Sequence, residues 1–239
     1  MVSCKLYKNK CDECERDLCM GKIPLLSNLD DIMLNKISKG VQTLDFKKGE
    51  KIFTRGEKAD KLYIVCSGKM KIYKNTIDGK EQIIYILADG DFIGAFNLLK
   101  EDEFDFDAEA LEDTSISTLE KREFDRIILN NPEITLKVLE KAYERIRKVE
   151  SLVERLSTNS SDAKVAGLLL NLTKDFGQKT DEGILLSLTI NREEMGSYAG
   201  IARETITRKL KLFEEMDLIK LLGTKRILIK DRSALRDMM

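Results

Sequence analysis

Four of the five cysteines lie close together near the start of the chain. Cys4, Cys11, Cys14 and Cys19 follow the spacing C-x6-C-x2-C-x4-C, and Cys66 stands apart. The short gap lets Cys11 and Cys14 reach one metal centre from a tight loop, and four thiolates suit either a 4Fe-4S cluster or a tetrahedral zinc ion. Because cysteine spacing does not choose the metal, zinc, thiol redox chemistry and an incidental cluster remain alternatives to the iron–sulfur cluster.

A second set of chemically capable residues lies in the segment ARETITRKLKLFEE. A helix over about residues 202–215 places Ile206, Leu210 and Phe213 on one apolar face. The opposite face then carries Arg203, Glu204, Thr207, Arg208 and Lys211. Arg can donate paired hydrogen bonds to guanine, Glu can accept from cytosine, and a Thr methyl can meet a thymine methyl. The face is therefore suited to reading the major groove, and the alternative is an ordinary solvated helix.

The flanking elements predict a winged helix-turn-helix. Asn191 is a suitable N-cap for a first helix that ends at Ala199, and Gly200 permits a sharp turn into the second helix. The apolar runs at 219–222 and 226–229 flank the turn Gly223-Thr224-Lys225, which predicts a hairpin wing. Upstream, we expect Asp162 to cap a helix that Gly177 ends, followed by a strand over 184–190.

The string ARETITRKL resembles the recognition helix of the CRP/FNR family of bacterial transcription regulators. In that family a Glu and an Arg four residues later contact bases, which implies this role for Glu204 and Arg208. Arg203 matches a third base-reading residue of the catabolite-activator branch. Thr207 stands where the oxygen-sensing branch usually carries Ser, so the half-site sequence cannot be assigned from this helix.

Composition and charge agree with a DNA-binding protein. The chain has 239 residues and 42% hydrophobic content, enough for one large or two modest domains. Residues 192–236 hold 11 Lys and Arg against 7 Asp and Glu, whereas residues 101–113 hold 8 acids and no base. The sequence contains no histidine, which excludes His-ligated haem and imidazole catalysis and argues against an enzyme. With no apolar span or signal region, the expected location is the cytoplasm.

Many short apolar runs separated by glycines occupy residues 46–90, which predicts an antiparallel roll. Their order resembles the cyclic-nucleotide-binding β-roll that forms the sensory domain of the CRP/FNR family. Catabolite-activator pockets carry a Glu and then an Arg after the turn at Gly94, but here Ala95 follows it and no cation lies between Lys100 and Lys121. We therefore expect no cAMP site, although a neutral or cationic ligand is not excluded.

A long helix is predicted from Pro132, which is tolerated in a first helical turn. Its apolar residues recur with heptad spacing and form a narrow seam, typical of a two-stranded coiled coil. The seam consists of Leu139, Ala142, Ile146, Val149, Val153 and Leu156. This predicts a homodimer, and the alternative is that the helix packs against the chain's own roll.

The resemblance covers most of the chain after Pro24 and implies an α+β architecture in four parts. These are a Cys-rich segment at 1–23, a β-roll sensory domain at 24–130, a dimerisation helix at 131–158 and a winged helix-turn-helix at 159–239. The cysteines resemble the oxygen-sensing branch, whose 4Fe-4S centre takes a fourth ligand from the sensory domain. No cysteine occupies that region here, so Cys4 is the expected substitute and Cys66 the runner-up.

Taken with the resemblance, these features predict a homodimeric transcription regulator that binds palindromic DNA. An oxygen-labile cluster would strengthen pairing of the seam, and RNA polymerase is a partner implied by the family. The alternatives are a same-family regulator with structural zinc, a thiol switch or a small-molecule effector. A small-ligand binding protein or an enzyme built on the roll is the rival from another class.

Overall fold

A computed structural model describes residues 40–100, 102–157 and 160–239. The chain divides into two compact units. One holds the described residues up to 72 together with residues 87–146, and the other holds residues 73–86 and 147–239. One hairpin and one long helix contribute to both units.

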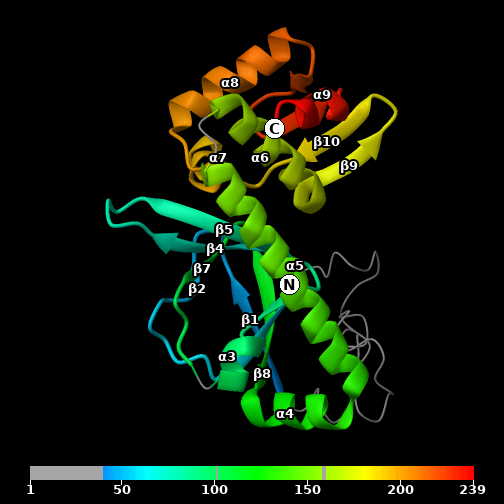
Figure 1. The fold of residues 1–239 in the computed structure, drawn as a ribbon. Helices are drawn as coiled ribbons and strands as arrows, with labels where there is room; N and C mark the ends of the chain where they lie inside the picture. Colours follow the sequence, from blue (N-terminus) through cyan, green and yellow to red (C-terminus); the bar gives the residue numbers. More distant parts are fainter. Residues whose placement is uncertain (1–39, 101, 158–159) are drawn as a thin grey trace. The chain divides into compact units, whose positions relative to one another are not determined.

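The first unit is built on an antiparallel β-roll (Figure 1). One sheet has the order β1-β8-β3-β6, and a second has the order β2-β7-β4-β5. The strands are β1 Val41–Phe46, β2 Lys51–Phe53, β3 Lys61–Ser67, β4 Lys69–Asn75, β5 Glu81–Ala88, β6 Phe92–Ile93, β7 Asp107–Ala110 and β8 Thr114–Glu120. The predicted roll is therefore present.

The turns of the roll depend on glycine for a steric reason. Gly68, between β3 and β4, has a φ of +92°, and a Cβ there would lie 2.6 Å from the carbonyl oxygen of Asp113. Gly94 has a φ of +100°, and its Cβ would lie 2.5 Å from the carbonyl oxygen of Lys61. A side chain at either position would be strained and would clash with backbone.

The described part of the first unit also contains α3 Ala95–Lys100, α4 Lys121–Asn130 and the first part of α5 Pro132–Ser157. Leu62 and Ile64 of β3, Phe124 and Ile127 of α4, and Ile134 of α5 lie in one buried core. The sequence patterns do not predict α4, which lies at the end of the stretch expected to form the roll.

The second unit contains α6 Ser161–Phe176, α7 Arg192–Ala199, α8 Arg203–Glu215 and α9 Arg232–Asp237. A four-stranded sheet has the order β11-β12-β10-β9. Its strands are β9 Gly177–Thr180, β10 Gly183–Ser187, β11 Ile219–Leu221 and β12 Arg226–Ile229. The predicted winged helix-turn-helix is present.

Two details of this unit differ from the prediction. The expected strand over 184–190 ends at Ser187, because β10 pairs with β12 only from Ile184 to Ser187. The N-cap of α6 is Ser160, whose hydroxyl accepts a hydrogen bond from the Ala163 N–H, so the expectation that Asp162 caps this helix is wrong. Asp162 lies in the first turn of α6 and has a different partner.

Candidate nucleic-acid interface

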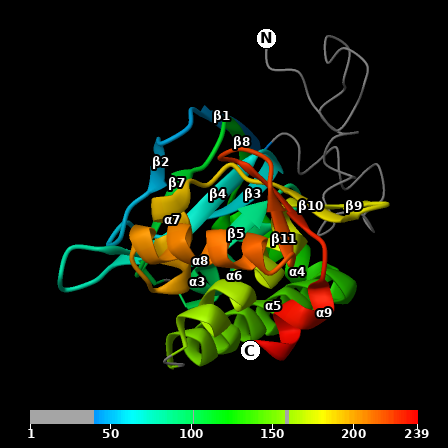
Figure 2. The same cartoon turned by 90° about the horizontal axis from the view of Figure 1, so that it is seen from above.

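Local interactions fix α7 and the turn that follows it. The Asn191 side chain accepts from the N–H groups of Glu193 and Glu194, and the Glu194 carboxylate accepts from the Asn191 N–H. This reciprocal capping box sets the start of α7. At the other end, Gly200 adopts a left-handed conformation with a φ of +67°. The chain can therefore turn sharply into α8, and Figure 2 shows the two helices side by side.

The apolar face of α8 holds the helix in the second unit. Ile206, Leu210 and Phe213 are each at most 1% exposed, and α8 contacts both α6 and α7. Burial of three large side chains on one face leaves the other face in solvent.

The outer face of α8 carries the five residues that the sequence singles out for DNA binding. All five are exposed, and together they line a single shallow hollow: Arg203, Glu204, Thr207, Arg208 and Lys211. The Thr207 hydroxyl donates to the Arg203 carbonyl oxygen at 3.0 Å. Because that hydroxyl bonds to the helix backbone, the methyl group is the part of Thr207 left for an outside contact.

The cations of this face are available to a ligand. Among the described residues, Arg203, Arg208 and Lys211 have no carboxylate within 4.0 Å. An unpaired guanidinium can turn toward a phosphate or a base edge without first breaking an ion pair. The exposed wing residues Lys225 and Arg226 add positive charge at the β11–β12 turn, where Gly223 has a φ of +85°.

Cys66 is the cysteine that lies among the described residues. Cys4, Cys11, Cys14 and Cys19 lie outside the described residues. Cys66 is half-buried on β3, and its thiol lies 3.0 Å from the Ser117 hydroxyl oxygen. Within the part of the chain that the structure describes, no three His, Cys, Asp or Glu side chains converge on a metal position.

Aromatic rings from the segment after Gly94 pack against aromatic rings of the roll. Phe104 stacks on Phe53 with ring centroids 3.8 Å apart, and Tyr63 and Phe106 complete the cluster. Phe104 is 1% exposed, and Ala95 is fully buried at the start of α3. This segment therefore contributes a packed apolar cluster to the roll.

The helix α5 has two different faces. The predicted seam residues are exposed over 39% to 57% of their surface, except for Ala142, which is half-buried. The exposed apolar row is longer than the sequence predicts, because Leu136 and Tyr143 also belong to it at 60% and 64%. In the part of α5 that belongs to the first unit, Leu139 and Ile146 are more than half exposed, so the described residues of the roll leave them largely uncovered.

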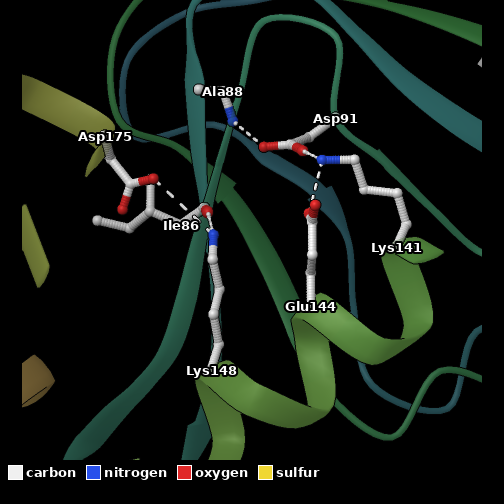
Figure 3. Close-up of polar contacts among 7 residues, drawn as sticks. All are labelled: Ile86, Ala88, Asp91, Lys141, Glu144, Lys148 and Asp175. Atoms are coloured by element: carbon white, nitrogen blue, oxygen red, sulfur yellow. Dashed lines mark hydrogen bonds and ion pairs between the residues drawn. The ribbon is translucent and has the colours of Figure 1, made fainter. Parts of the chain in front are cut away.

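The other face of α5 carries lysines that form ion pairs and hydrogen bonds with other residues of the chain (Figure 3). In the first unit, Lys141 bridges Asp91 at 3.3 Å and Glu144 at 2.8 Å. Burial alone would lower the pKa of Lys141, but Glu144 and Asp91 together outweigh it, so the pKa lies above its usual value. In the second unit, Lys148 lies 3.5 Å from the Ile86 carbonyl oxygen and 3.8 Å from Asp175 of α6.

The combination defines the class of protein: an antiparallel β-roll, a long helix and a winged helix-turn-helix with a polar recognition face. Residues 43–131 match the family described as "Cyclic nucleotide-binding domain", and residues 163–238 match "Crp-like helix-turn-helix domain". Among the described residues, no helix is long and apolar enough to cross a membrane.

Known proteins of the same class are similar over most of their length. The chain is 30% identical to the transcriptional activator protein Anr of Pseudomonas protegens, over 87% of this chain and 84% of Anr. It is 28% identical to the CRP-like cAMP-activated global transcriptional regulator of Mycobacterium tuberculosis, over 92% and 97%. The structure of FixK2 from Bradyrhizobium japonicum has the same fold, with a TM-score of 0.73, 23% identity and coverage of 83% and 96%. The chain belongs to the CRP/FNR family of DNA-binding transcription regulators.

Proposed function

We propose that two copies of this chain bind palindromic double-stranded DNA and regulate transcription. Each copy binds one half-site, with Arg203, Glu204, Thr207 and Arg208 facing the base edges and Lys211 contacting phosphate. The observation that carries this proposal is the outer face of α8, where three cations are exposed and unpaired among the described residues. Unpaired cations on one helix face beside a basic wing are typical of a DNA-binding surface, whereas an ordinary solvated helix does not require this arrangement.

The exposed apolar row on α5 supports pairing of two copies through this helix. Exposure of large apolar side chains to water is unfavourable. A second α5 would cover these side chains, which recur at heptad spacing, and their burial would stabilise the dimer. A dimer with two-fold symmetry places two reading helices about one DNA turn apart. RNA polymerase is the further partner that a regulator of this family would contact from the promoter, and such a regulator works in the cytoplasm.

The signal we propose is oxygen or redox state, sensed by a 4Fe-4S cluster on Cys11, Cys14, Cys19 and Cys4. The relative Anr is named only as an activator, so the support is the sulfur ligand set itself. Structural zinc or a thiol switch uses the same cysteines and is the alternative. A cAMP signal, as in the mycobacterial relative, is disfavoured because Ala95 follows Gly94 and no Lys or Arg lies between Lys100 and Lys121 to hold a phosphate. Catalysis by the roll is not proposed.

The test combines purification without oxygen with DNA selection. The protein is purified anaerobically, its iron, sulfide and zinc are measured, and a random DNA pool is enriched by binding. We expect about four iron and four sulfide per chain and an enriched palindrome with half-sites about one helical turn apart. An enriched palindrome with zinc in place of iron would keep the regulator and remove the cluster. No enriched sequence in any metal or redox state would overturn DNA reading.

A further inference from the structure

Lys209 is the cation of α8 that does not face outward. Arg208 and Lys211 are exposed, whereas the side chain of Lys209 is only 16% exposed. Its Nζ lies 2.7 Å from Oδ1 of Asp162 and 2.9 Å from Oδ2, and it donates a hydrogen bond to Oδ2. One ammonium group therefore contacts both oxygens of the carboxylate.

The carboxylate of this pair lies at the start of α6. Asp162 is in the first turn of α6, two residues after the Ser160 cap, where the helix dipole favours a negative charge. Its Oδ1 is buried and accepts no hydrogen bond among the described residues, although Nζ of Lys209 lies 2.7 Å away and the whole side chain is 40% exposed. The charge of Lys209 is therefore the partner that this buried oxygen depends on.

The pair constrains a motion of α8 that its apolar face leaves open. Contacts of Ile206, Leu210 and Phe213 keep α8 on the unit, but apolar contacts have no fixed direction. Side chains extend about 5–6 Å from a helix axis, so a rotation of roughly 10° moves them by about 1 Å. A displacement of that size is enough to lose a base hydrogen bond. A directional contact beside Arg208 opposes such rotation.

We propose that the Lys209–Asp162 pair is a positioning pair, which fixes the rotation of α8 about its own axis so that Glu204 and Arg208 meet the base edges. The inference rests on the proposed DNA reading and deepens it. Lys209 itself does not touch DNA, because its ammonium group is occupied by Asp162. The pair acts on sequence discrimination, whereas the exposed cations act on overall attraction to phosphate.

Lys209→Met and Lys211→Met form a matched pair of variants, because each removes one positive charge from the same helix. Affinity is measured for the selected palindrome and for random DNA across a salt series. We expect Lys211→Met to weaken both DNAs by the same factor. Lys209→Met should weaken the palindrome at least tenfold more than random DNA, and Lys209→Arg should restore the wild-type ratio of the two affinities.

Asp162→Asn separates positioning from charge, because it removes a negative charge and so reduces repulsion of DNA. It should leave random-DNA affinity equal or higher and still lower the palindrome-to-random ratio, whereas Asp181→Asn on an exposed turn should leave that ratio unchanged. The double variant Asp162→Asn with Lys209→Met should have the ratio of either single variant. If Lys209→Met does not fold, the near-isosteric Asp162→Asn supplies the same comparison.

The outcomes separate this inference from the function on which it rests. A wild-type protein that prefers no sequence would overturn both. A wild-type protein that prefers a palindrome, with equal ratios in Lys209→Met and Lys211→Met, would overturn the positioning pair alone. Loss of thermal stability in Lys209→Met or Asp162→Asn without a change in ratio would reduce the pair to a structural contact and also overturn it.

Discussion

Arg208 and Lys209 are neighbours in the sequence and have opposite environments. Successive helical residues point about 100° apart, so one faces solvent and the other packs toward α6. Arg208 is exposed and unpaired among the described residues, and Lys209 is tied to Asp162. The same formal charge can therefore contribute to base reading at one position and to helix orientation at the next.

Replacing Arg208 by Ala tests base reading directly. A guanidinium that makes paired hydrogen bonds to guanine contributes roughly 1–3 kcal/mol of discrimination. We expect the variant to lose about this much affinity for the selected palindrome and to tolerate any base at one position of each half-site. Binding titrations against half-site variants measure both effects, with the wing variant Lys225→Ala as the control for loss of charge. An equal loss on palindrome and random DNA would mean that Arg208 contacts only phosphate.

The roles of these residues were predictable to different degrees. The outward position of Arg208 follows from the spacing of Ile206, Leu210 and Phe213, which is a local pattern. The pairing of Lys209 with Asp162 joins residues 47 positions apart and leaves no trace in either local pattern. Asp162 also resembled an N-cap, because Asp is favoured there, but Ser160 is equally suited and lies at the observed helix start.

At the scale of elements, strong local signals gave accurate helices in the second unit. Asn191 and Gly200 bracket α7 by capping and by a left-handed turn, so its bounds could be predicted. The helix α4 lacked such signals, since Glu120 makes no side-chain cap hydrogen bond. The strand β9 is exposed at all four residues and forms by pairing with β10, so no alternation of apolar residues marked it.

Gly200→Ala tests the turn between α7 and α8. An L-residue in the left-handed conformation costs roughly 1–2 kcal/mol, and a Cβ at Gly200 would also lie 2.3 Å from Leu156 Cδ2. Gly223→Ala is the matched control, because Gly223 has a φ of +85° and nothing within 4 Å of its Cβ position.

We expect Gly200→Ala to lower the free energy of unfolding of the second unit more than Gly223→Ala does, as measured by chemical denaturation. The extra loss should shrink when Leu156→Ala is added, because the smaller side chain removes the clash. Equal losses in the two glycine variants would show that backbone strain alone matters and that the Leu156 contact adjusts freely.

Ile146→Glu tests α5 as the pairing surface. Ile146 is 56% exposed in the single chain, so the substitution should leave the fold intact while placing two carboxylates in the seam of a dimer. We expect sedimentation to show a dimer weakened at least a hundredfold. Arg147→Glu is the control, because it changes the charge by more and lies outside the seam. If Ile146→Glu dimerises with the same dissociation constant as the wild-type protein, α5 is not the pairing surface.

At the scale of the whole molecule, the signal, the seam and the reading helices must act on one equilibrium. A cluster can favour DNA binding only if it binds the DNA-competent dimer more tightly than the other states. If that state is the α5-paired dimer, then cluster loading, dimerisation and palindrome affinity must rise and fall together. Linked changes of this kind can be measured without knowing the arrangement of the N-terminal segment.

Replacing single cysteines tests whether the cluster acts through the dimer. Cys11, Cys14 and Cys19 are joined by short loops, and Cys4 adds a loop of similar closure cost, whereas Cys66 lies far along the chain on β3. We expect Cys4→Ser to lose the anaerobic cluster absorbance, the tight dimer and the palindrome affinity together. Cys66→Ser should keep all three, because the Cys66 thiol is half-buried beside Ser117.

Exposure of the unmodified protein to oxygen tests the same coupling between cluster, dimer and DNA binding. Exposure should bleach the cluster, weaken the dimer and lower palindrome affinity with one time course, and Ile146→Glu should lose the cluster without a further change in its already weak DNA binding. Loss of absorbance in Cys66→Ser with retention in Cys4→Ser would move the fourth ligand to the roll. If oxygen changes neither dimerisation nor DNA affinity, and zinc is bound in place of iron, the proposal of an oxygen signal is wrong. The proposals of DNA reading by α8 and of pairing through α5 would be unaffected.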